Sequence, residues 1–338
     1  MNHVPLVDSY GRHINYLRIS LTEACNFRCV YCVPKEGLPA QVKPSGFLTP
    51  DQIARFARII SGLGVYRVRL TGGEPLLRTD ILEIVRKIKD VPGITDLSIT
   101  TNGSKLVPLV HSLKAAGLDR VNISFDSVDP ERFKKITLSN AYAEVLGAVH
   151  AAVRAGFPVK LNMVILNGVT PGEIIRFVEL AVKFPLEVRF LEFMPLCGSG
   201  WSNDLFYPIE KVREIVRENF KLGQVEARGS EVAQSFPLEG GCGKVGFIAS
   251  LTESFCEQCS RMRLSADGQI YPCLFSDTRV SVAELLRREA SDEAVIEAIR
   301  HAARIKPAGN QFKERPFEKD TGRAVEVHET PLIHHIGG

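Results

Sequence analysis

The chain has 338 residues with a formal net charge of +3 and a pI of about 8.4, and 24% of its residues are charged. This length suits one large α/β domain with an appendage, or two domains, and the small excess of positive charge does not argue for a nucleic-acid partner. His150, Arg154 and Lys160 interrupt the longest apolar stretch, so no segment is expected to span a membrane. Residues 1–24 lack the pattern of a secretory signal, so a cytoplasmic chain with reduced thiols is expected.

Short β-branched runs alternate with longer amphipathic segments between residue 15 and about residue 220. This alternation predicts six βα units and a parallel sheet. A capping box followed by proline marks two helix starts, at Thr49-Pro50 and at Thr170-Pro171. The predicted strands are 16–22, 66–71, 95–100, 120–126, 158–165 and 186–193.

Polar and apolar side chains alternate along these strands, whereas a parallel strand buried on both faces should be apolar throughout. The apolar positions are therefore predicted to pack against helices, and the polar positions to line the inner face of a curved sheet. A complete eight-stranded barrel fills its interior with aliphatic side chains. A polar interior therefore predicts an incomplete (βα)6 barrel of the TIM type that encloses a water-filled cavity. A flat open sheet with one solvated face is the alternative.

The predicted cavity is expected to be cationic. Arg18, Arg69 and Lys160 lie on its wall, with Arg189 as a further candidate. Cations buried without an anion are costly, and the sequence supplies no obvious anionic partner for these side chains. A polyanionic ligand is therefore expected in the cavity.

The segment CNFRCVYC places Cys25, Cys29 and Cys32 within eight residues. A structural zinc site requires four ligands, and a disulfide framework requires an even number of cysteines in an oxidising compartment. Thiolates also hold four-iron clusters, for which four cysteines are the usual complement. Three cysteines would leave one iron with an open position, where a substrate or cosubstrate could bind.

Nearer the C-terminus the sequence contains a second group of three cysteines, Cys256, Cys259 and Cys273. Cys242 could complete a zinc ribbon with them, and spacing alone supports zinc and a second iron-sulfur cluster equally. If the segment containing Arg261 and Arg263 is extended, both guanidinium groups face the same side and form a cationic surface beside the metal. A solvated charged strand is the alternative for this pair. Cys197 is expected to be a small buried side chain.

Gly72-Gly73-Glu74-Pro75 follows the second predicted strand, and together with the C-x3-C-x2-C segment it resembles the radical S-adenosylmethionine enzymes. The C-terminal cysteine group and the terminal Gly337-Gly338 narrow the resemblance to the GTP 3',8-cyclase family of molybdenum cofactor biosynthesis. The resemblance covers residues 10–275 and the last two residues. Glu23-Ala24 stands where the family commonly has aspartate and arginine, and Ser260 where it commonly has asparagine, but neither departure removes a ligand.

The resemblance implies two four-iron, four-sulfur clusters and S-adenosylmethionine as cofactors. The first cysteine group would hold a cluster whose open iron binds the methionyl part of S-adenosylmethionine, and the C-terminal group would hold a cluster that binds the guanine base of GTP. The residues implied at the S-adenosylmethionine site are Tyr31, Gly72, Gly73, Glu74, Pro75, Ser124 and Met194. Those implied around GTP are Arg18, Arg69, Thr100, Lys160, Arg261 and Arg263, and those implied in catalysis are Arg261, Arg263, Gly337 and Gly338.

The implied reaction begins with one-electron cleavage of S-adenosylmethionine to a 5'-deoxyadenosyl radical, which abstracts hydrogen from C3' of GTP and leads to 3',8-cyclo-7,8-dihydro-GTP. The implied partners are an external electron donor, a second copy of the chain in a homodimer, and cyclic pyranopterin monophosphate synthase as the next enzyme of the pathway. A radical S-adenosylmethionine core over residues 1–225 and a C-terminal region over residues 226–338 are the expected domains. Two other functions remain open, a peptide-modifying radical S-adenosylmethionine enzyme and a non-catalytic metal-binding redox regulator.

Overall fold

The computed structural model describes residues 4–32, 46–196, 199–225, 232–309 and 336. The strands of these residues form one eleven-stranded sheet in the order β11-β10-β9-β1-β2-β3-β4-β5-β6-β8-β7. They are β1 (Tyr16–Ser20), β2 (Arg67–Thr71), β3 (Asp96–Thr101), β4 (Arg120–Ser124), β5 (Val159–Ile165), β6 (Leu186–Glu192), β7 (Gln234–Pro237), β8 (Lys244–Ile248), β9 (Arg261–Leu264), β10 (Gln269–Tyr271) and β11 (Val280–Ser281).

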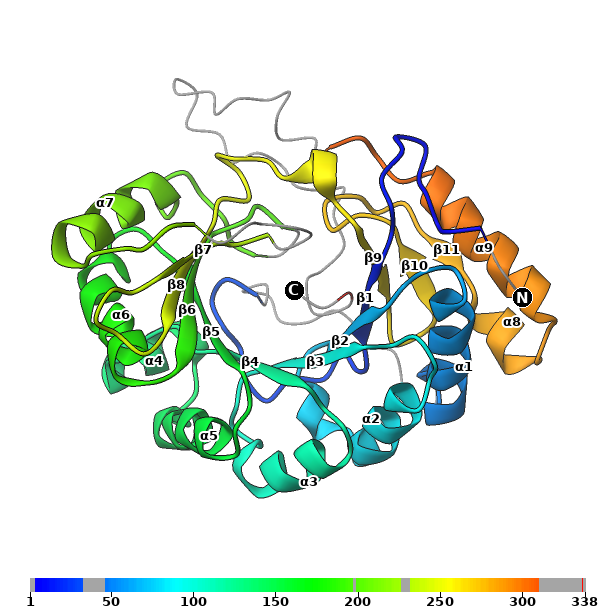
Figure 1. The fold of residues 1–338 in the computed structure, drawn as a ribbon, viewed down its shortest axis with the longest axis horizontal. Coiled ribbons are helices and arrows are strands. Elements are labelled where there is room, and N and C mark those ends of the chain that lie inside the picture. Colours follow the sequence, from blue (N-terminus) through cyan, green and yellow to red (C-terminus); the bar gives the residue numbers. More distant parts are fainter. Residues whose placement is uncertain (1–3, 33–45, 197–198, 226–231, 310–335, 337–338) are drawn as a thin grey trace.

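The sheet curves into an open barrel. Neighbouring strands are parallel from β9 through β1 to β6 and on to β8, while β7, β10 and β11 pair in an antiparallel manner at the two edges. β8 and β9 are consecutive in the sequence but lie on opposite sides of the opening, and the chain between them crosses it (Figure 1). The predicted incomplete TIM-type barrel is therefore confirmed, and its six predicted strands gain one further parallel neighbour on each side.

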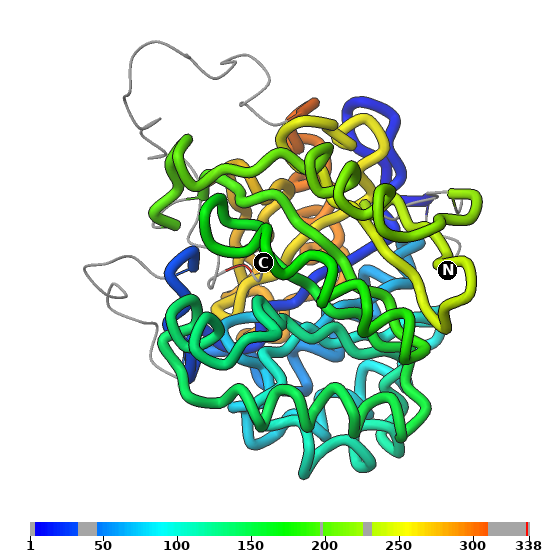
Figure 2. Tube along the Cα trace, turned by 90° about the vertical axis from the view of Figure 1, so that its left-hand side faces the viewer, coloured from blue at the N-terminus to red at the C-terminus, as the bar shows by residue number. Residues whose placement is uncertain are grey.

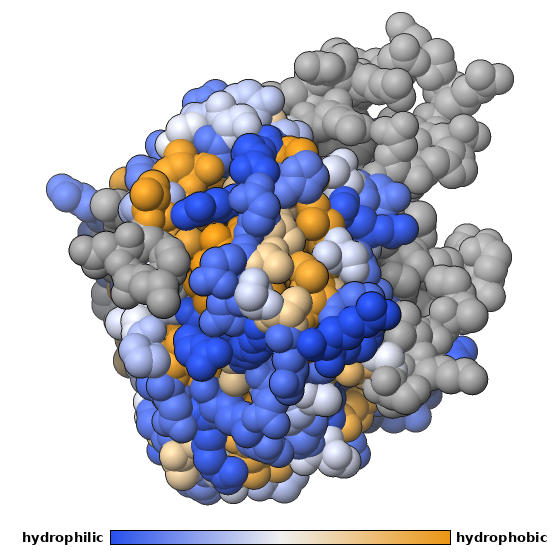
Figure 3. All heavy atoms as spheres, turned by 90° about the vertical axis from the view of Figure 1, so that its right-hand side faces the viewer, coloured by the Kyte–Doolittle hydropathy of each residue, from blue (hydrophilic) through white to orange (hydrophobic). Residues whose placement is uncertain are grey.

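The helices lie on the outer, convex side of the sheet (Figure 1), and Figure 2 shows the same arrangement from the side. None of the helices in the described residues is both long and apolar enough to span a bilayer. The face over α8 and α9 is largely hydrophilic, with small apolar patches between polar side chains (Figure 3). The helices are α1 (Pro50–Ser61), α2 (Ile81–Lys89), α3 (Val110–Ala115), α4 (Pro130–Thr137), α5 (Tyr142–Arg154), α6 (Ile174–Lys183), α7 (Ile209–Asn219), α8 (Ala283–Arg287) and α9 (Asp292–Arg304).

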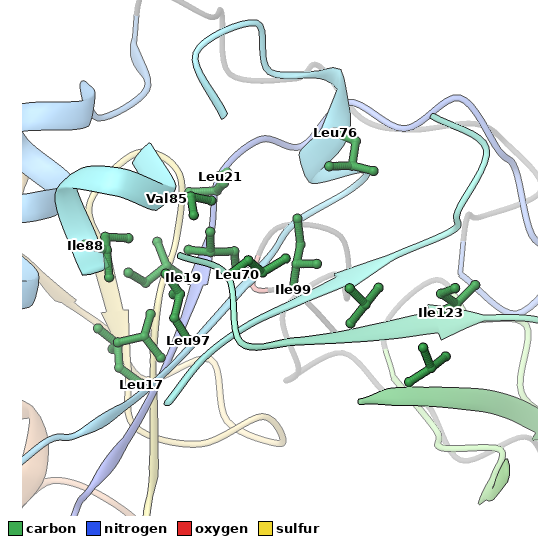
Figure 4. Close-up of a cluster of buried hydrophobic side chains, with 14 of the residues drawn as sticks. Leu17, Ile19, Leu21, Leu70, Leu76, Val85, Ile88, Leu97, Ile99 and Ile123 are labelled. Carbon is green, nitrogen blue, oxygen red and sulfur yellow. The ribbon is translucent and has the colours of Figure 1, made fainter. Parts of the chain in front are cut away.

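The apolar positions of the strands form the core between sheet and helices. Burying a leucine or isoleucine side chain contributes roughly 1.5–3 kcal/mol, so these positions decide which face of each strand points outward. The opposite face, with its polar side chains, is thereby left to the inside of the barrel. Side chains of β1, β2, β3 and α2 meet in this core (Figure 4): Leu17, Ile19, Leu70, Leu97, Ile99, Val85 and Ile88.

One of the two predicted capping boxes is confirmed. Thr49 Oγ1 accepts a hydrogen bond from the N–H of Gln52 at 3.3 Å, and the Gln52 side chain accepts one from the N–H of Thr49 at 2.9 Å, which completes the capping box of α1. At the second position a helix does begin at Pro171, with Thr170 as its N-cap, but it is a 3-10 helix (Pro171–Glu173) that leads into α6, and the predicted capping box does not form. The hydroxyl of Thr170 bonds with the backbone of Leu166 instead, and the glutamate that would complete the box binds the segment after β4. Tertiary contacts thus replaced the local cap.

Candidate active site

A cavity occupies the inside of the open barrel. Its wall consists of inner-face side chains of the strands together with the loops that follow them. Because residues from β1 through β6 enclose the same space, the flat open sheet is excluded. The polar side chains that the strands contribute to the wall are Arg18, Arg69, Thr71, Thr100, Thr101, Ser124, Asn162, Arg189 and Glu192.

The first cysteine group lies in the loop after β1, and Cys25, Cys29 and Cys32 all line the cavity. Two backbone hydrogen bonds of 2.9 and 3.1 Å join this loop to the C-terminal end of α4. Burial raises the pKa of all three thiols, that of Cys32 to about 12. A site this poorly solvated favours ionised thiols only when a bound metal supplies positive charge.

These thiols suit a multi-iron cluster better than a single metal ion. Within the part of the chain that the structure describes, no three Cys, His, Asp or Glu side chains are placed so that they could hold one metal ion. A four-iron cluster is larger than one ion, and each thiolate binds a different iron. Three soft ligands on a cavity wall therefore fit a cluster with its fourth iron open to the cavity.

Gly72 and Gly73 let the end of β2 approach the loop after β1 closely. A Cβ atom on Gly72 would lie 2.4 Å from the carbonyl oxygen of Thr22, and one on Gly73 would lie 2.3 Å from that of Ala24. Gly72 also has a φ of +137°, which other residues rarely adopt. The N–H of Gly73 donates to the carbonyl of Thr22 at 2.7 Å. Both glycines line the cavity, so the close approach shapes its wall.

Glu74 is buried behind this wall and fixes neighbouring loops. Its carboxylate accepts hydrogen bonds from the N–H of Leu76 at 3.0 Å, the hydroxyl of Thr101 at 2.7 Å and the N–H of Asn102 at 2.6 Å. Burial raises the pKa of Glu74 to about 7, and the three donors oppose that shift. Pro75 starts a short 3-10 helix. Unlike the two glycines, Glu74 and Pro75 are not part of the cavity wall.

We expect Gly73→Ala to lower the free energy of unfolding and to weaken S-adenosylmethionine binding at least tenfold, because the added Cβ has no room beside Ala24. Gly147→Ala on α5 is the matched control, since its Cβ would meet nothing nearer than Val107 at 3.9 Å. That control should raise the free energy of unfolding by about 0.5–1 kcal/mol. Urea unfolding and anaerobic equilibrium dialysis measure the two effects. Equal stability and ligand affinity in the two variants would contradict this role for Gly73.

Arg18 and Arg69 are neighbours on the inner face, because β1 and β2 pair in register at these residues. Burial lowers the pKa of Arg69 to about 9, Tyr16 opposes the shift, and Arg18 adds to it. Burial likewise lowers the pKa of Arg18, whose Nε has no hydrogen-bond partner among the described residues. Thr100 Oγ1 on the same wall is also without one. Since guanidinium groups stay charged in proteins, this wall is set up to receive an anion.

Arg261 and Arg263 face the same side of β9, as an extended segment predicted. β9 pairs in parallel with β1, which places Arg263 opposite Arg18. Burial, with repulsion from Arg18 and then Arg261, lowers the pKa of Arg263 well below its usual range. Arg263 Nη1 donates to the carbonyl of Ile336 at 3.3 Å. Ile336 directly precedes Gly337-Gly338, so the chain reaches the arginine cluster immediately before this glycine pair.

Lys160 lies on the inner face, but the expectation that it has no anionic partner is wrong. Its Nζ lies 3.3 Å from Glu187 Oε2, and Glu187 also pairs with Arg189 at 2.7 Å. Burial raises the pKa of Glu187, but Arg189 and Lys160 outweigh burial and lower it overall. Glu187 was missed in the sequence, although it precedes Arg189 by two residues and therefore shares its face of β6.

The second cysteine group surrounds the paired strands β9 and β10. Cys256 begins a 3-10 helix and Cys259 follows it, two residues before β9, while Cys273 lies two residues after β10. The antiparallel pairing of β9 with β10 brings these ends together. Burial raises the pKa of Cys273. Burial acts in the same direction on Cys259, but Lys306, Arg261 and then Arg12 outweigh it and bring that pKa to about 7.

The zinc ribbon completed by Cys242 is contradicted by the fold. Cys242 is exposed and lies two residues before β8 begins. Its N–H donates to the carbonyl of Val182 at the end of α6. β8 and β10 lie on opposite sides of the barrel opening. Cys242 is therefore remote from the cysteine group around β9 and β10.

The parallel register of the strands shows how the two cysteine groups and the arginines are ordered along the barrel axis. The first cysteine loop and Gly72 follow the carboxyl ends of β1 and β2, and Arg18 lies in the middle of β1. Arg261 pairs with Tyr16 at the amino end of β1, so Cys259 lies near that opposite end. A ligand that extends along the arginines therefore has one thiol group at each of its ends.

The implied site residues fall into several sets. Lys160, Arg261 and Arg263 lie beside the wall, Glu74 and Pro75 lie behind it, and Cys256, Cys259 and Cys273 lie at the ends of β9 and β10. Gly337 and Gly338 lie outside the described residues, as does Cys197, which was expected to be a small buried side chain. Those on the wall are Arg18, Cys25, Cys29, Tyr31, Cys32, Arg69, Gly72, Gly73, Thr100, Ser124 and Met194.

Three further residues near the site had been given no role from the sequence. Asp126 accepts a hydrogen bond from the Tyr31 hydroxyl at 2.6 Å. It lies two residues after Ser124 and lines the same cavity, so the alternation of side chains was the signal in the sequence that could have indicated its place. Arg12 donates to the carbonyl of Cys256, and Lys306 donates to the carbonyls of Arg261 and Pro272 beside the second cysteine group. No local pattern marks these two cations, because the groups that they bind are distant in the sequence.

Comparisons with known proteins agree with this geometry. The model of the Radical SAM superfamily matches residues 19–181, and that of Molybdenum Cofactor Synthesis C matches residues 186–312. GTP 3',8-cyclase of Syntrophomonas wolfei is 41% identical over 95% of this chain and 99% of its own length, and mitochondrial GTP 3',8-cyclase of Arabidopsis thaliana is 42% identical over 98% and 83%. Molybdenum cofactor biosynthesis protein 1 of Drosophila melanogaster is 41% identical over 98% of this chain, which spans only 57% of that relative.

Solved structures share the fold. Streptococcus suis SuiB bound to S-adenosylmethionine aligns with a TM-score of 0.62 at 15% identity, over 84% of this chain and 67% of that one. The anSMEcpe structure with bound AdoMet aligns with a TM-score of 0.50 at 13% identity, over 76% and 74%. At these identities the likeness extends to the barrel and not to the substrate.

Proposed function

This chain belongs to the GTP 3',8-cyclase family of radical S-adenosylmethionine enzymes, and on that premise we propose that it converts GTP into 3',8-cyclo-7,8-dihydro-GTP for molybdenum cofactor biosynthesis. The observation that carries the proposal is the cationic cavity, with three thiols at one end and a second group of three thiols beyond the arginine cluster at the other. An enzyme that generates a radical at one end and holds a polyanionic nucleotide at the other needs this order.

S-adenosylmethionine binds at the carboxyl ends of the strands in this proposal. Cys25, Cys29 and Cys32 hold a four-iron cluster, which when bound supplies the electron that cleaves S-adenosylmethionine to methionine and a 5'-deoxyadenosyl radical. The remaining side chains orient the cosubstrate and exclude water from it. They are Tyr31, Ser124 and Met194, with the backbone of Gly72 and Gly73, supported from behind by Glu74 and Pro75.

GTP lies between the two thiol groups, with its phosphates against Arg18, Arg69 and Lys160 and its base toward Cys256, Cys259 and Cys273. Guanidinium groups bind phosphate oxygens through charge-assisted hydrogen bonds. The unpartnered Nε of Arg18 would gain an acceptor, and the polyanion would relieve the repulsion among the buried arginines. Fixing both ends of the nucleotide holds its ribose toward the cosubstrate, as hydrogen abstraction from C3' requires.

We expect Arg69→Ala to weaken GTP binding about ten- to a hundredfold and to leave guanosine binding unchanged, because guanosine lacks the phosphates. Lys160→Ala should show the same selectivity. It also removes one of the cations that compensate the negative charge of Glu187, so this carboxylate would repel the phosphates. The double variant Lys160→Ala/Glu187→Gln should therefore bind GTP better than Lys160→Ala alone. Anaerobic calorimetry with both ligands measures these affinities. Equal fractional losses for GTP and guanosine would show that the two cations do not bind the phosphates.

Replacing Arg261 or Arg263 with lysine should lower turnover more than GTP affinity. Arg261 lies level with the amino end of β1 and Arg263 level with its middle. In this proposal both face the base and ribose, where charge redistributes as the radical forms. Lysine keeps the charge but loses the planar donor array. Steady-state kcat and KM for GTP separate the two effects. A rise in KM with kcat unchanged would assign these residues to ordinary substrate binding.

The proposed reaction is tested by anaerobic incubation of the reconstituted chain with S-adenosylmethionine, dithionite and each of the four ribonucleoside triphosphates. We expect a cyclised product from GTP alone. A chain loaded with two clusters that forms no product from GTP would overturn the proposed activity.

The two other functions have distinct signatures. A peptide-modifying enzyme would be expected to carry more clustered cysteines in the C-terminal extension than the group of three found here, since the fourth cysteine of that region, Cys242, lies apart from them. A redox regulator would leave the cationic cavity without a role. Iron, sulfide and zinc analysis after anaerobic purification distinguishes them. Two four-iron clusters per chain favour the cyclase, and one zinc ion favours the regulator.

Three partner assignments belong to this proposal. An external electron donor reduces the first cluster, the chain acts as a homodimer, and its product passes to cyclic pyranopterin monophosphate synthase. A cytoplasmic location would keep all cysteines of the two groups reduced and available to iron.

A further inference from the structure

Two buried cations lie beside the second cysteine group. Lys306 is 3% exposed and Arg12 is 8% exposed. Lys306 Nζ donates to the carbonyl of Arg261 at 2.8 Å and to the carbonyl of Pro272. Arg12 Nη1 donates to the carbonyl of Cys256 at 2.8 Å. Arg12 also donates to the carbonyls of Pro307 and Ala308, and each of the other bound carbonyls belongs to a cysteine of the group or to a residue within two positions of one.

The charges of these two cations are balanced differently. Arg12 Nε lies 2.6 Å from the carboxylate of Asp8, and both side chains are almost fully buried. Lys306 binds carbonyl groups, and no carboxylate within the described ranges forms an ion pair with it. A cation buried without an anionic partner is costly. Its position therefore calls for a negative group nearby.

The second cysteine group is that negative group. Lys306 Nζ binds the carbonyl of Arg261, two residues after Cys259, and the carbonyl of Pro272, the residue before Cys273. Three thiolates around a four-iron core carry a net negative charge, and one-electron reduction adds another. A fixed cation at this place stabilises the cluster and favours its reduced form.

We propose that Lys306 is a positioning residue of the second iron-sulfur site, which ties β9 to the segment after β10 and supplies the charge that keeps the cluster's iron bound and its reduction potential raised. This inference rests on the proposed function, which places a cluster on these cysteines. Arg12 shares the task of holding the loop at Cys256, but its charge is already compensated by Asp8.

Three variants at one position separate charge from hydrogen bonding. Lys306→Met removes both, Lys306→Gln keeps a donor without charge, and Lys306→Arg keeps the charge. Anaerobically reconstituted parent and variants are compared by EPR-monitored redox titration of both clusters and by the rate at which a chelator removes iron. We expect the methionine and glutamine variants to lower the reduction potential of the second cluster only, and the arginine variant to restore most of it. Iron of the second site should leave Lys306→Met about 10- to 100-fold faster.

Two matched controls accompany these variants. Arg304→Gln removes a cation two residues away that is 54% exposed and paired with Glu297 at 2.6 Å, and it should change neither measurement. The double variant Asp8→Asn/Arg12→Gln removes a balanced pair of charges. It should speed iron loss from the second site and shift its potential much less than Lys306→Met.

The outcomes distinguish this inference from the proposed function. A parent chain with one cluster, or with zinc at the second group, would overturn both. Two clusters in the parent and an unchanged second potential in Lys306→Met would overturn the inference alone. If Lys306→Met loses the first cluster as well, it has misfolded, and Lys306→Gln is then compared with Lys306→Arg. Equal second-cluster potentials in that pair would also overturn the inference.

Discussion

Replacing Cys256, Cys259 and Cys273 together with alanine is expected to leave S-adenosylmethionine cleavage measurable and to abolish the cyclised product. The reason is the order of groups along the barrel axis, which places these thiols at the amino end, beyond the arginine cluster. Replacing Cys25, Cys29 and Cys32 should abolish both activities, because these thiols line the cavity next to Gly72 and Gly73.

Chromatography of 5'-deoxyadenosine and of the GTP-derived product, under anaerobic conditions with dithionite, measures the two activities separately. Each triple variant should retain the iron of the other group. Cys242→Ala is the matched control, since this cysteine is exposed and lies on the other side of the barrel opening. GTP cyclisation at near the parent rate in the C-terminal triple variant would refute the substrate role of the second group.

Deleting Gly337 and Gly338 should preserve folding, both clusters and GTP affinity and yet abolish product formation. The carbonyl of Ile336 accepts a hydrogen bond from Arg263, and the Ile336 side chain is fully buried. The residue that precedes the two glycines therefore lies beside the arginine cluster. Residues without side chains can enter a space that a Cβ atom would fill.

The comparison variant Gly337→Ala/Gly338→Ala keeps the chain length and adds two methyl groups. If access to a confined space is the reason for the glycines, it should lose most of its turnover while GTP affinity, measured by anaerobic calorimetry, stays the same. Unchanged turnover after the deletion would mean that the end of the chain is an ordinary frayed terminus.

The sequence by itself determined the barrel strands and the inner wall of the cavity. All six predicted strands are present, and Arg18 and Arg69 point inward with Ser124, as the alternation predicted. Alternation is a local property, because successive side chains of a strand point to opposite faces and the apolar set must be buried. The cysteine spacing and the Gly72-Gly73 pair are likewise local signals.

Tertiary structure alone decided the partners of the charged groups and the edges of the barrel. β8 and β9 are short, and their parallel pairing with β6 and β1 joins segments far apart in the sequence. The same pairing separates Cys242 from the second cysteine group. Lys306 binds the carbonyl of Arg261, 45 residues away, and Arg12 binds that of Cys256, 244 residues away. Such contacts depend on how distant elements pack, and no spacing along the chain encodes them.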